Sequence, residues 1–453
     1  MQWRAPTFLA VMIVLALLLV PSALSTVEWS SFRGDIENSG FRNHWPEGSN
    51  PDLDILWERD MSSEITSSLS VGEWGVCLGG LDGNVTCLSP DNGTIRWVLS
   101  TISPVYATPT RSPASGWLFC ATGDGRVMAM DSSDGSVEWE WQSPSASEIH
   151  SSPLVVDGSV IFGSYDSTVY CLDEFTGQEV WNYTGIDSWV HPASPYFQGR
   201  VYFGTCGGEM TCLFLNNGTL GWTFSAEYIP SSASVSDGKL FFGSYDSNLY
   251  GLNCSTGELI WSAELGGGIQ SSPAVGNGMV LVGCNDGKLY SVDVRDGSAL
   301  WKRDIQQSNL GSSPVLLGDM VAVSGKQGLA LLNASHGGTV RSFETGDCGD
   351  LSPAFYDGRV YWGDTLGRVR CLGIPPHSSK NNSDGQDDQG DDADADLDGS
   401  GDDDVDDGVS GNGSDTEGSV QDGPFYVPLM IMAVVVAISW AIYWGVIRRR
   451  DDQ

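Results

Sequence analysis

The residues best suited to hold a metal ion lie in an Asp-rich stretch toward the end of the chain. Positions 1, 3, 5, 6 and 9 of a calcium-binding loop are matched there by Asp394, Asp396, Asp398, Gly399 and Asp402. Position 12 is Val405, although a bidentate carboxylate belongs at that place. The stretch is therefore either a calcium site or a solvated stalk, and the missing ligand favours the stalk.

Cysteine thiols are a second source of chemistry. Cys77 with Cys87, and Cys206 with Cys212, are expected on paired strands of single hairpins, and they are the predicted disulfides. The alternative is that these cysteines are buried free thiols. A small packed residue also explains why one strand position of an internal repeat is occupied by Cys87, Cys171, Cys212 and Cys371.

A third set of side chains occupies one recurring position, two residues before a Ser-Pro pair or its equivalent. Its eight members are Thr66, Tyr106, His150, Pro192, Pro230, Gln270, Gly311 and Asp350. Their chemistry varies from unit to unit, whereas that of the flanking positions does not. We therefore interpret five of them as candidate ligand-binding residues, namely Thr66, Tyr106, His150, Gln270 and Asp350. The alternative is that all eight are turn residues without a functional constraint.

The motifs of common catalytic sites are missing from the sequence. It contains no Ser-His-Asp signature, Walker loop, H-E-x-x-H motif or C-x-x-C-H haem motif. Of the five histidines, no two have the spacing of metal ligands. The residues therefore predict binding more strongly than catalysis.

An internal repeat positions these side chains. Intervals of 39 to 42 residues separate Trp57, Trp97, Trp139, Trp181, Trp222, Trp261 and Trp301. The best-formed unit, residues 150–181, predicts short strands at 154–156, 160–164, 168–173 and 179–183, which are separated by Asp-Gly, Asp-Ser and Thr-Gly turns. Each unit is therefore predicted to be a four-stranded antiparallel meander. We interpret the seven tryptophans as structural residues that fill the contacts between units.

Repeats of this length with four strands are typical of β-propeller blades. Seven complete units precede residue 350, and residues 350–372 supply the first three strands of an eighth. The segment Leu53–Arg59 has the pattern of an outer strand with no inner strands before it. We expect it to complete the eighth blade and close the ring. The alternative is a seven-bladed ring with a stray segment.

The T/D-G-x-x-x-W unit endings and the head WSSFRGDIENSG resemble the quinoprotein-type propellers, from Trp29 to about Gly373. This resemblance implies an all-β, eight-bladed propeller of PQQ-like repeats over 26–374. Members include pyrroloquinoline quinone (PQQ) dehydrogenases, in which adjacent cysteines, a carboxylate base and calcium ligands surround the quinone. Members also include the propeller lipoprotein of the outer-membrane β-barrel assembly machine. This sequence has no adjacent cysteines and no long insertion between blades. A binding or scaffold module without a cofactor is therefore expected, with a small PQQ- and calcium-dependent oxidoreductase as the alternative.

The two ends carry membrane signals. Residues 1–25 have the basic start, apolar run and small residues of a cleaved signal peptide, the alternative being an uncleaved anchor. Residues 375–424 form an acidic linker that is predicted to be disordered. Residues 425–447 contain no charge and are long enough to span a bilayer, and Arg448 to Arg450 follow in a cytoplasmic tail, 448–453. A single-pass protein of the cell membrane, with an extracellular propeller, is predicted.

Charge limits the class of partner. The formal net charge is −36, and even residues 26–374 hold 40 acidic against 17 basic residues. Such a chain repels phosphate backbones, so nucleic acid is excluded as a partner. The sequence predicts a monomeric propeller that binds an extracytoplasmic protein, peptide or glycan. Asn-x-Ser/Thr sequons, such as those at Asn182 and Asn217, agree with export.

Overall fold

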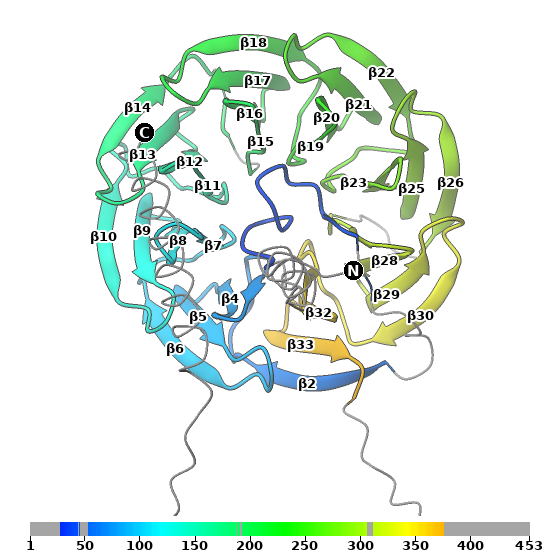
Figure 1. Cartoon of the computed structure of the whole chain (residues 1–453), viewed down its shortest axis with the longest axis horizontal. Helices are drawn as coiled ribbons and strands as arrows, with labels where there is room; N and C mark the ends of the chain where they lie inside the picture. Colours follow the sequence, from blue (N-terminus) through cyan, green and yellow to red (C-terminus); the bar gives the residue numbers. More distant parts are fainter. Residues whose placement is uncertain are drawn as a thin grey trace, which may run out of the picture. The chain divides into compact units, whose positions relative to one another are not determined.

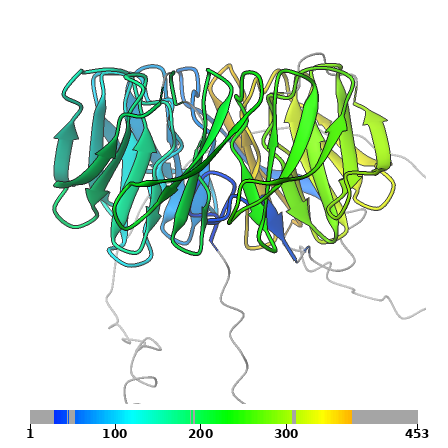
Figure 2. The same cartoon turned by 90° about the horizontal axis from the view of Figure 1, so that it is seen from above.

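The computed structural model describes residues 28–43, 45, 53–186, 188–190, 193–305 and 311–375 of the chain. Within these ranges the secondary structure consists of 33 β-strands, which form eight sheets around a common axis (Figure 1). Each sheet is one blade, and the blades stand side by side when the ring is seen edge-on (Figure 2). The predicted all-β, eight-bladed propeller is therefore confirmed.

Blades 1 to 4 follow the order of the chain. Blade 1 contains β3 (Ser70–Gly72), β4 (Gly75–Gly79), β5 (Asn84–Leu88) and β6 (Ile95–Ser100). Blade 2 contains β7 (Thr110–Arg111), β8 (Trp117–Ala121), β9 (Arg126–Asp131) and β10 (Val137–Gln142). Blade 3 contains β11 (Leu154–Val156), β12 (Ser159–Gly163), β13 (Val169–Asp173) and β14 (Glu179–Tyr183). Blade 4 contains β15 (Tyr196–Phe197), β16 (Arg200–Gly204), β17 (Glu209–Phe214) and β18 (Leu220–Ser225).

Blades 5 to 8 complete the ring. Blade 5 contains β19 (Ser234–Ser236), β20 (Lys239–Gly243), β21 (Asn248–Asn253) and β22 (Leu259–Glu264). Blade 6 contains β23 (Ala274–Gly276), β24 (Met279–Gly283), β25 (Lys288–Asp293) and β26 (Ala299–Asp304). Blade 7 contains β27 (Val315–Leu317), β28 (Met320–Gly325), β29 (Gly328–Asn333) and β30 (Thr339–Glu344), with β1 (Phe41–Arg42) added in parallel to β27. Blade 8 contains β31 (Ala354–Tyr356), β32 (Arg359–Gly363), β33 (Arg368–Gly373) and β2 (Asp54–Asp60).

The burial of each strand follows its place in the blade. Inner strands are covered by neighbouring blades on both faces, so they consist of continuous apolar runs, as in the fully buried Val160, Ile161 and Phe162 of β12. The outer strand β14 alternates instead, and its tryptophan, Trp181, is the buried residue of the strand. The hydrophobic core therefore lies between the blades.

The outer-strand tryptophans repeat one contact between blades. The indole Nε1 of Trp181 donates a hydrogen bond to the carbonyl of Leu215 in the next blade, at 2.8 Å. Its ring lies against Gly218, where an added Cβ would come within 2.5 Å of it. Gly218 also has a φ of +66°, so glycine meets two requirements at this turn. Equivalent bonds of 2.8–3.2 Å are made by Trp57, Trp97, Trp139, Trp222, Trp261 and Trp301.

Blade 8 is assembled from both ends of the propeller. Strand β2 pairs antiparallel with β33, with Trp57 opposite Cys371. The buried guanidinium of Arg370 joins these strands, because it donates to Glu58 on β2 at 2.6 Å and to the fully buried Asp364 at 2.9 Å. The ring is therefore closed by strand pairing without a covalent link, as the outer-strand pattern near residue 53 predicts.

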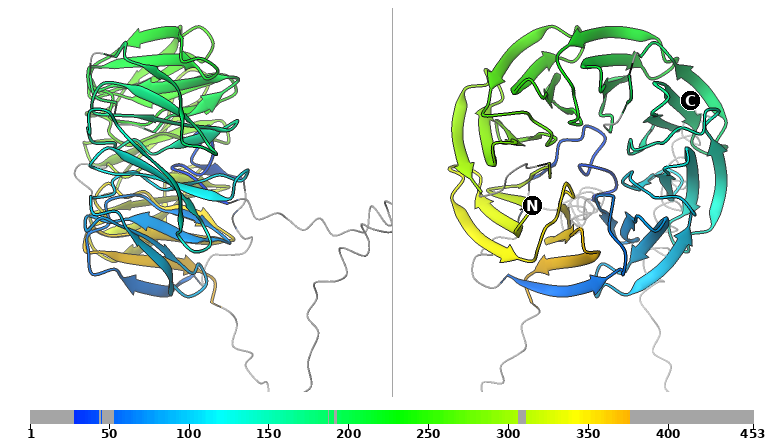
Figure 3. Two further views of the ribbon diagram at one scale, coloured as in Figure 1. Left: turned by 90° about the vertical axis from the view of Figure 1, so that its left-hand side faces the viewer. Right: turned by 180° about the vertical axis from the view of Figure 1, so that it is seen from behind.

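An N-terminal segment, residues 29–42, runs inside the ring (Figure 3). Its backbone hydrogen-bonds to the innermost strands or their flanking residues in six blades, from Val71 of blade 1 to Leu316 of blade 7. Arg33 at its centre is only 2% exposed and donates to the carbonyl of Pro273 at 3.0 Å. Burial lowers the pKa of Arg33 to about 9. The segment therefore fastens the blades together from the inside.

The cysteines differ from the prediction. All ten lie within the described ranges and all are free thiols. Cys77 and Cys87 are opposite each other on β4 and β5, as predicted, but they are not bridged. Burial raises the pKa of the Cys77 thiol. The predicted Cys206–Cys212 pair is wrong in geometry as well. Cys212 is opposite Tyr202 and Trp222, whereas Cys206 lies in the turn after β16.

The predicted end segments cannot be compared with the fold. The signal peptide, the spanning segment 425–447, the tail and almost all of the linker lie outside the described residues. The Asp394–Asp402 calcium loop lies outside them as well. No helix in the described part of the chain has the length and apolar character needed to cross a membrane.

Candidate binding site at the channel mouth

The third set of predicted residues meets at one end of the central channel. A cavity of about 170 Å³ lies there, and Phe32 of the N-terminal segment contributes to its lining. Seven of the eight recurring positions line this cavity, one from each of seven blades: Thr66, Tyr106, His150, Pro230, Gln270, Gly311 and Asp350. All five candidate ligand-binding residues are therefore brought together.

A ring of serine hydroxyls beneath these residues sets their positions. The backbone N–H of Ser272 donates to Ser313 Oγ of the next blade at 2.9 Å. Five further bonds of 2.9–3.1 Å repeat this contact between neighbouring blades. Because each hydroxyl is two residues after a recurring position, the ring holds these positions at one height in the channel.

Blade 4 departs from the predicted register. The equivalent bond is donated there by the backbone N–H of Ala193, whose acceptor is Ser232 Oγ at 2.9 Å. The stretch from Pro195 to the turn glycine Gly199 is one residue shorter than in blade 3, so the register moves by one. The residue two places before Ala193 is His191, and the assignment of Pro192 is corrected to it on sequence register alone. Both residues lie outside the described ranges.

His150 is held by polar and aromatic neighbours. Its Nε2 lies 2.7 Å from Glu148 Oε2, and the hydroxyl of Tyr165 lies 3.0 Å from its Nδ1. The ring stacks on Tyr106, with centroids 4.2 Å apart. Burial lowers the pKa of His150, and Glu148 partly offsets this effect. Both ring nitrogens of His150 contact neighbouring side chains. The residue is therefore better placed to contact a ligand through its ring carbons than to accept a proton from it.

Gln270 and Asp350 form the other side of the mouth. Gln270 Nε2 donates to Asp350 Oδ2 at 2.9 Å, and the hydroxyl of Tyr245 donates to Gln270 Oε1 at 3.3 Å. The bond from Gln270 to Asp350 passes over blade 7, where Gly311 leaves room: a Cβ on Gly311 would lie 1.8 Å from Asp350 Oδ1. Partial loss of water around Asp350 raises its pKa, and nearby Asp347 raises it further, while the Gln270 bond lowers it. The pair is a preformed polar group with oxygens left to accept.

The polar side chains described at the mouth are bonded to one another or to the scaffold. Ser152 Oγ, two residues after His150 in sequence, accepts from the backbone N–H of Thr108 at 2.9 Å. Across the described residues, no three His, Cys, Asp or Glu side chains are grouped to hold a metal ion.

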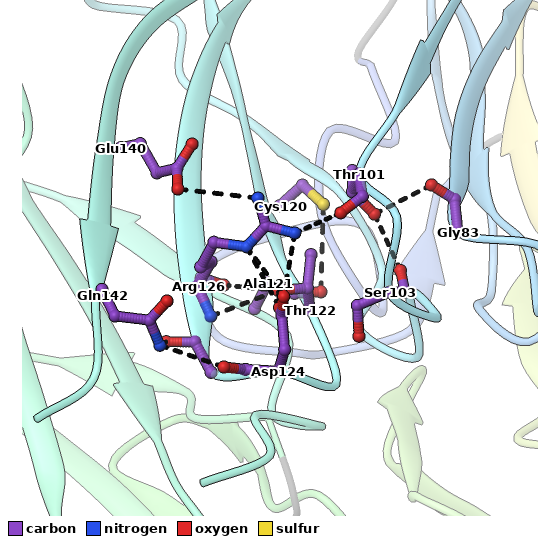
Figure 4. A network of polar contacts seen from close by, with 11 residues as sticks. Gly83, Thr101, Ser103, Cys120, Ala121, Thr122, Asp124, Arg126, Glu140 and Gln142 are labelled. Atoms are coloured by element: carbon purple, nitrogen blue, oxygen red, sulfur yellow. Dashed lines mark hydrogen bonds and ion pairs between the residues drawn. The ribbon is translucent and has the colours of Figure 1, made fainter. Parts of the chain in front are cut away.

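The loops around the mouth are acidic, and a cation beside one of these loops, Arg126, is neutralised. Arg126 at the start of β9 forms ion pairs with Asp124 at 2.9 Å and Glu140 at 3.6 Å (Figure 4). It also donates to the carbonyl of Thr101. These bonds raise the pKa of Arg126 and lower that of Asp124. The guanidinium therefore connects two blades and leaves no net positive charge at this place.

Sequence reasoning missed the aromatic residues beside the recurring positions. Tyr165 and Tyr245 occupy one equivalent place, the second residue after the glycine that ends the second strand of the blade. Other blades have Leu81, Gly123, Cys206, Asn285 and Thr365 there. That variation was a usable signal, because it matches the variation of the recurring positions themselves. Trp189 and Tyr228 also share one equivalent place, two residues before His191 and Pro230. Other blades have Glu64, Pro104, Glu148, Gly268 and Cys348 there, so the same kind of variation was available in the sequence.

The eight-bladed fold is that of a quinoprotein-type propeller. The chain belongs to the PQQ_2 family, described as outer membrane protein assembly factor BamB, which it matches over residues 81–233 and 215–347. The structure of BamB from Moraxella catarrhalis is similar, with a TM-score of 0.63 and 20% identity over 72% of this chain and 99% of that one. Quinohemoprotein alcohol dehydrogenase from Comamonas testosteroni has a TM-score of 0.66 and 13% identity over 82% of this chain and 84% of that one. These two likenesses show the fold.

Curated relatives match over short stretches. Human (Homo sapiens) beta-alanine-activating enzyme is 31% identical over 115 residues, which is 24% of this chain and 10% of the enzyme. The chain thus spans about a tenth of the length of that relative. The match shows the shared repeat and no more.

The residues at the mouth do not fit the quinone that the dehydrogenase resemblance implies. PQQ is a tricarboxylate, so a buried site for it needs cationic side chains or metal ligands around the carboxylates. The described lining residues contain Asp350 and no lysine or arginine. A second anion beside Asp350 would be repelled, and the cavity is therefore the wrong sign for this cofactor.

Proposed function

We propose that this chain is a binding or scaffold module that holds a protein, peptide or glycan at the mouth of its propeller channel. The supporting observation is that seven blades each place a chemically different residue around one cavity. The contacts that hold the blades together repeat, but these residues do not. Variation confined to one surface of a repeated scaffold is what a specific binding site requires.

The proposal includes a cellular location. Residues 1–25 as a signal peptide and 425–447 as a membrane span, followed by three arginines, support an anchored protein with its propeller outside. Protease added to intact cells should cut within the acidic segment 380–420 and release a folded propeller. A propeller that is cut only after the membrane is permeabilised would mean that the opposite topology is correct.

The binding proposal is tested with a triple variant of the mouth. His150→Ala, Gln270→Ala and Asp350→Ala are introduced together into the full chain. The native partner is captured by cross-linking on intact cells. We expect capture to fall at least about tenfold, because each side chain supplies contacts worth about 0.5–1.5 kcal/mol. The melting temperature should change little, because none of the three side chains belongs to the core between the blades.

A matched triple variant serves as the control. His336→Ala, Gln178→Ala and Asp134→Ala change the same three residue types, all exposed, on turns at the opposite ends of their blades. Capture by this control should equal that of the parent. Equal loss in both triple variants, or full capture by the mouth variant, would move the interaction away from the channel. Substrate-dependent dye reduction by the PQQ-supplemented protein would favour the oxidoreductase instead.

A further inference from the structure

We propose that an arc of aromatic side chains beside the channel mouth docks a basic peptide segment of a partner protein, with arginine or lysine side chains seated on the rings. The arc consists of Tyr106, His150, Tyr165, Trp189, Tyr228 and Tyr245. This inference rests on the proposed binding function and adds the chemical class of the partner. It also assigns four residues that the sequence analysis did not include.

Four rings of the arc form one continuous stack. The centroids of Tyr106 and His150 are 4.2 Å apart, and those of His150 and Tyr165 are 4.5 Å apart. Tyr165 and Trp189 follow at 4.9 Å with planes only 4° apart. Trp189 at the end of the stack is 54% exposed, and Tyr165 covers only one face of its indole. Indole and phenol rings that are held rigidly and left exposed are typical of binding surfaces.

Two further tyrosines extend the arc into blade 5. The rings of Tyr228 and Tyr245 are 5.0 Å apart, and the two side chains are 37% and 41% exposed. Burial raises the pKa of Tyr228 to about 12, and the thiol of Cys206 contributes to that shift. Burial raises the pKa of Tyr165, and the same thiol adds to that shift, so Cys206 is close to both the stack and the tyrosine pair. The arc ends at Tyr245, whose hydroxyl reaches Gln270 of the mouth.

Charge selects a cationic occupant for these rings. The loops at this end of the blades hold, in their described residues, eleven acidic side chains and one basic side chain, Lys326. Two of the acids, Glu148 and Glu227, are exposed and adjoin the arc in sequence at His150 and Tyr228. The face of an aromatic ring attracts cations, and carboxylates beside it strengthen the attraction. The same acidic side chains would repel an anionic ligand.

A peptide fits this geometry better than a single small cation. The stacked rings run from blade 2 to the start of blade 4, and the tyrosine pair follows in blade 5, so cationic side chains several residues apart could be held at once. The channel mouth lies directly beside this path and offers Asp350 and Gln270 as acceptors for peptide N–H groups. A basic segment can therefore use both surfaces together.

The test uses fluorescence anisotropy of a labelled tetra-arginine peptide with the full chain in detergent. Tetra-glutamate and maltotetraose are the comparison ligands. We expect tetra-arginine alone to bind. The double variant Tyr165→Ala, Trp189→Ala should weaken it at least about tenfold, because the exposed indole of Trp189 is lost together with the Tyr165 ring that supports it. Tyr165→Phe keeps the ring and should bind like the parent.

Phe175→Ala is the control, because Phe175 is also an aromatic with 52% exposure but lies on a turn at the opposite end of blade 3. It should leave the affinity unchanged. Equal binding by the Tyr165/Trp189 variant and the parent, or tighter binding of maltotetraose than of tetra-arginine, would overturn the inference. The two proposals fail separately: loss of native capture by the mouth variant without any tetra-arginine binding would support the proposed function and reject the basic partner.

Discussion

The outer and inner ends of the blades obey different rules. At the periphery, Trp181 and six other tryptophans make one hydrogen bond and one glycine contact, blade after blade. At the channel mouth the equivalent positions hold threonine, tyrosine, histidine, proline, glutamine, glycine or aspartate. A closed ring requires the same contact between every pair of neighbouring blades at the periphery, because one poorly matched blade would leave a sheet edge exposed. The second region is free of that demand, and its differences carry specificity.

The one break in the outer pattern has a structural cause. Blade 7 has Arg341 where other outer strands have tryptophan, opposite Leu331. The tryptophan contact needs a glycine turn between the third and fourth strands of the following blade. Blade 8 has no such turn, because its fourth strand is β2 from the start of the chain. The exception therefore identifies the seam of the ring.

The largest expected effect comes from removing the seam strand. Deletion of residues 53–60 leaves β33 without its partner and Arg370 without Glu58. Blades support one another only as neighbours in a closed array, so we expect the sharp melting transition to become broad and to shift downward by about 10 °C or more. Calorimetry of the deleted and parent chains measures this.

A deletion of eight residues within the acidic segment 380–420 is the control for that experiment, and it should melt like the parent. A chain that lacks residues 53–60 yet melts as sharply and at the same temperature as the parent would show that the strand pairing contributes little to closure.

A smaller effect separates the two regions with one residue type. Trp181→Ala removes a ring that is 9% exposed and fills the contact between blades 3 and 4, so it should cost about 3–5 kcal/mol. Trp189→Ala removes a ring that is 54% exposed and should cost less than about 1 kcal/mol. Trp181→Phe keeps most of the packing but loses the bond to Leu215, and it should fall between them. Urea unfolding of the three variants provides the values. Similar losses for both alanine variants would remove the distinction between scaffold and site.

The fold was predictable because its signal is repeated. The Trp–Gly interval recurs in blade after blade, and a repeat of four short strands has few architectures open to it. Even the pairing of residues near Trp57 with the last blade follows from counting strands. The geometry within a single repeat could not be predicted by counting strands. The turn containing Cys206 follows β16, so this cysteine does not oppose Cys212, and spacing alone suggested otherwise.

The candidate site was predictable only as a set of positions. Register identified Thr66, Gln270 and Asp350, because each stands in the same relation to a serine of the inner ring. Register failed in blade 4, where one residue is missing from the hairpin. It also gave no indication of contacts between blades, such as Gln270 with Asp350, since these depend on the diameter of the ring and on the gap left by Gly311.

The smallest expected effect is a pH dependence confined to the mouth. Burial lowers the pKa of His150 from its ordinary value of 6.5, against the opposing pull of Glu148. The unfolded chain therefore takes up a proton at this histidine before the folded chain does. Stability should fall as the pH drops from about 7.5 to about 5, because protons bind preferentially to the unfolded state in that window. Burial raises the pKa of Tyr165, which faces the ring, so this phenol keeps its proton throughout the range.

Melting curves of the parent and of His150→Gln across that pH range test this effect. The melting temperature of the parent should fall more steeply on acidification, by on the order of 1 °C relative to the variant. Glu148→Gln sharpens the test, because removing the carboxylate leaves burial unopposed and should steepen the fall further. The outer control is Trp181→Phe, which titrates nothing and should run parallel to the parent. Parallel curves for His150→Gln and the parent would mean that the pKa of the histidine is the same in the folded and unfolded chains. In that case water reaches the His150 ring in the mouth, and burial does not lower its pKa.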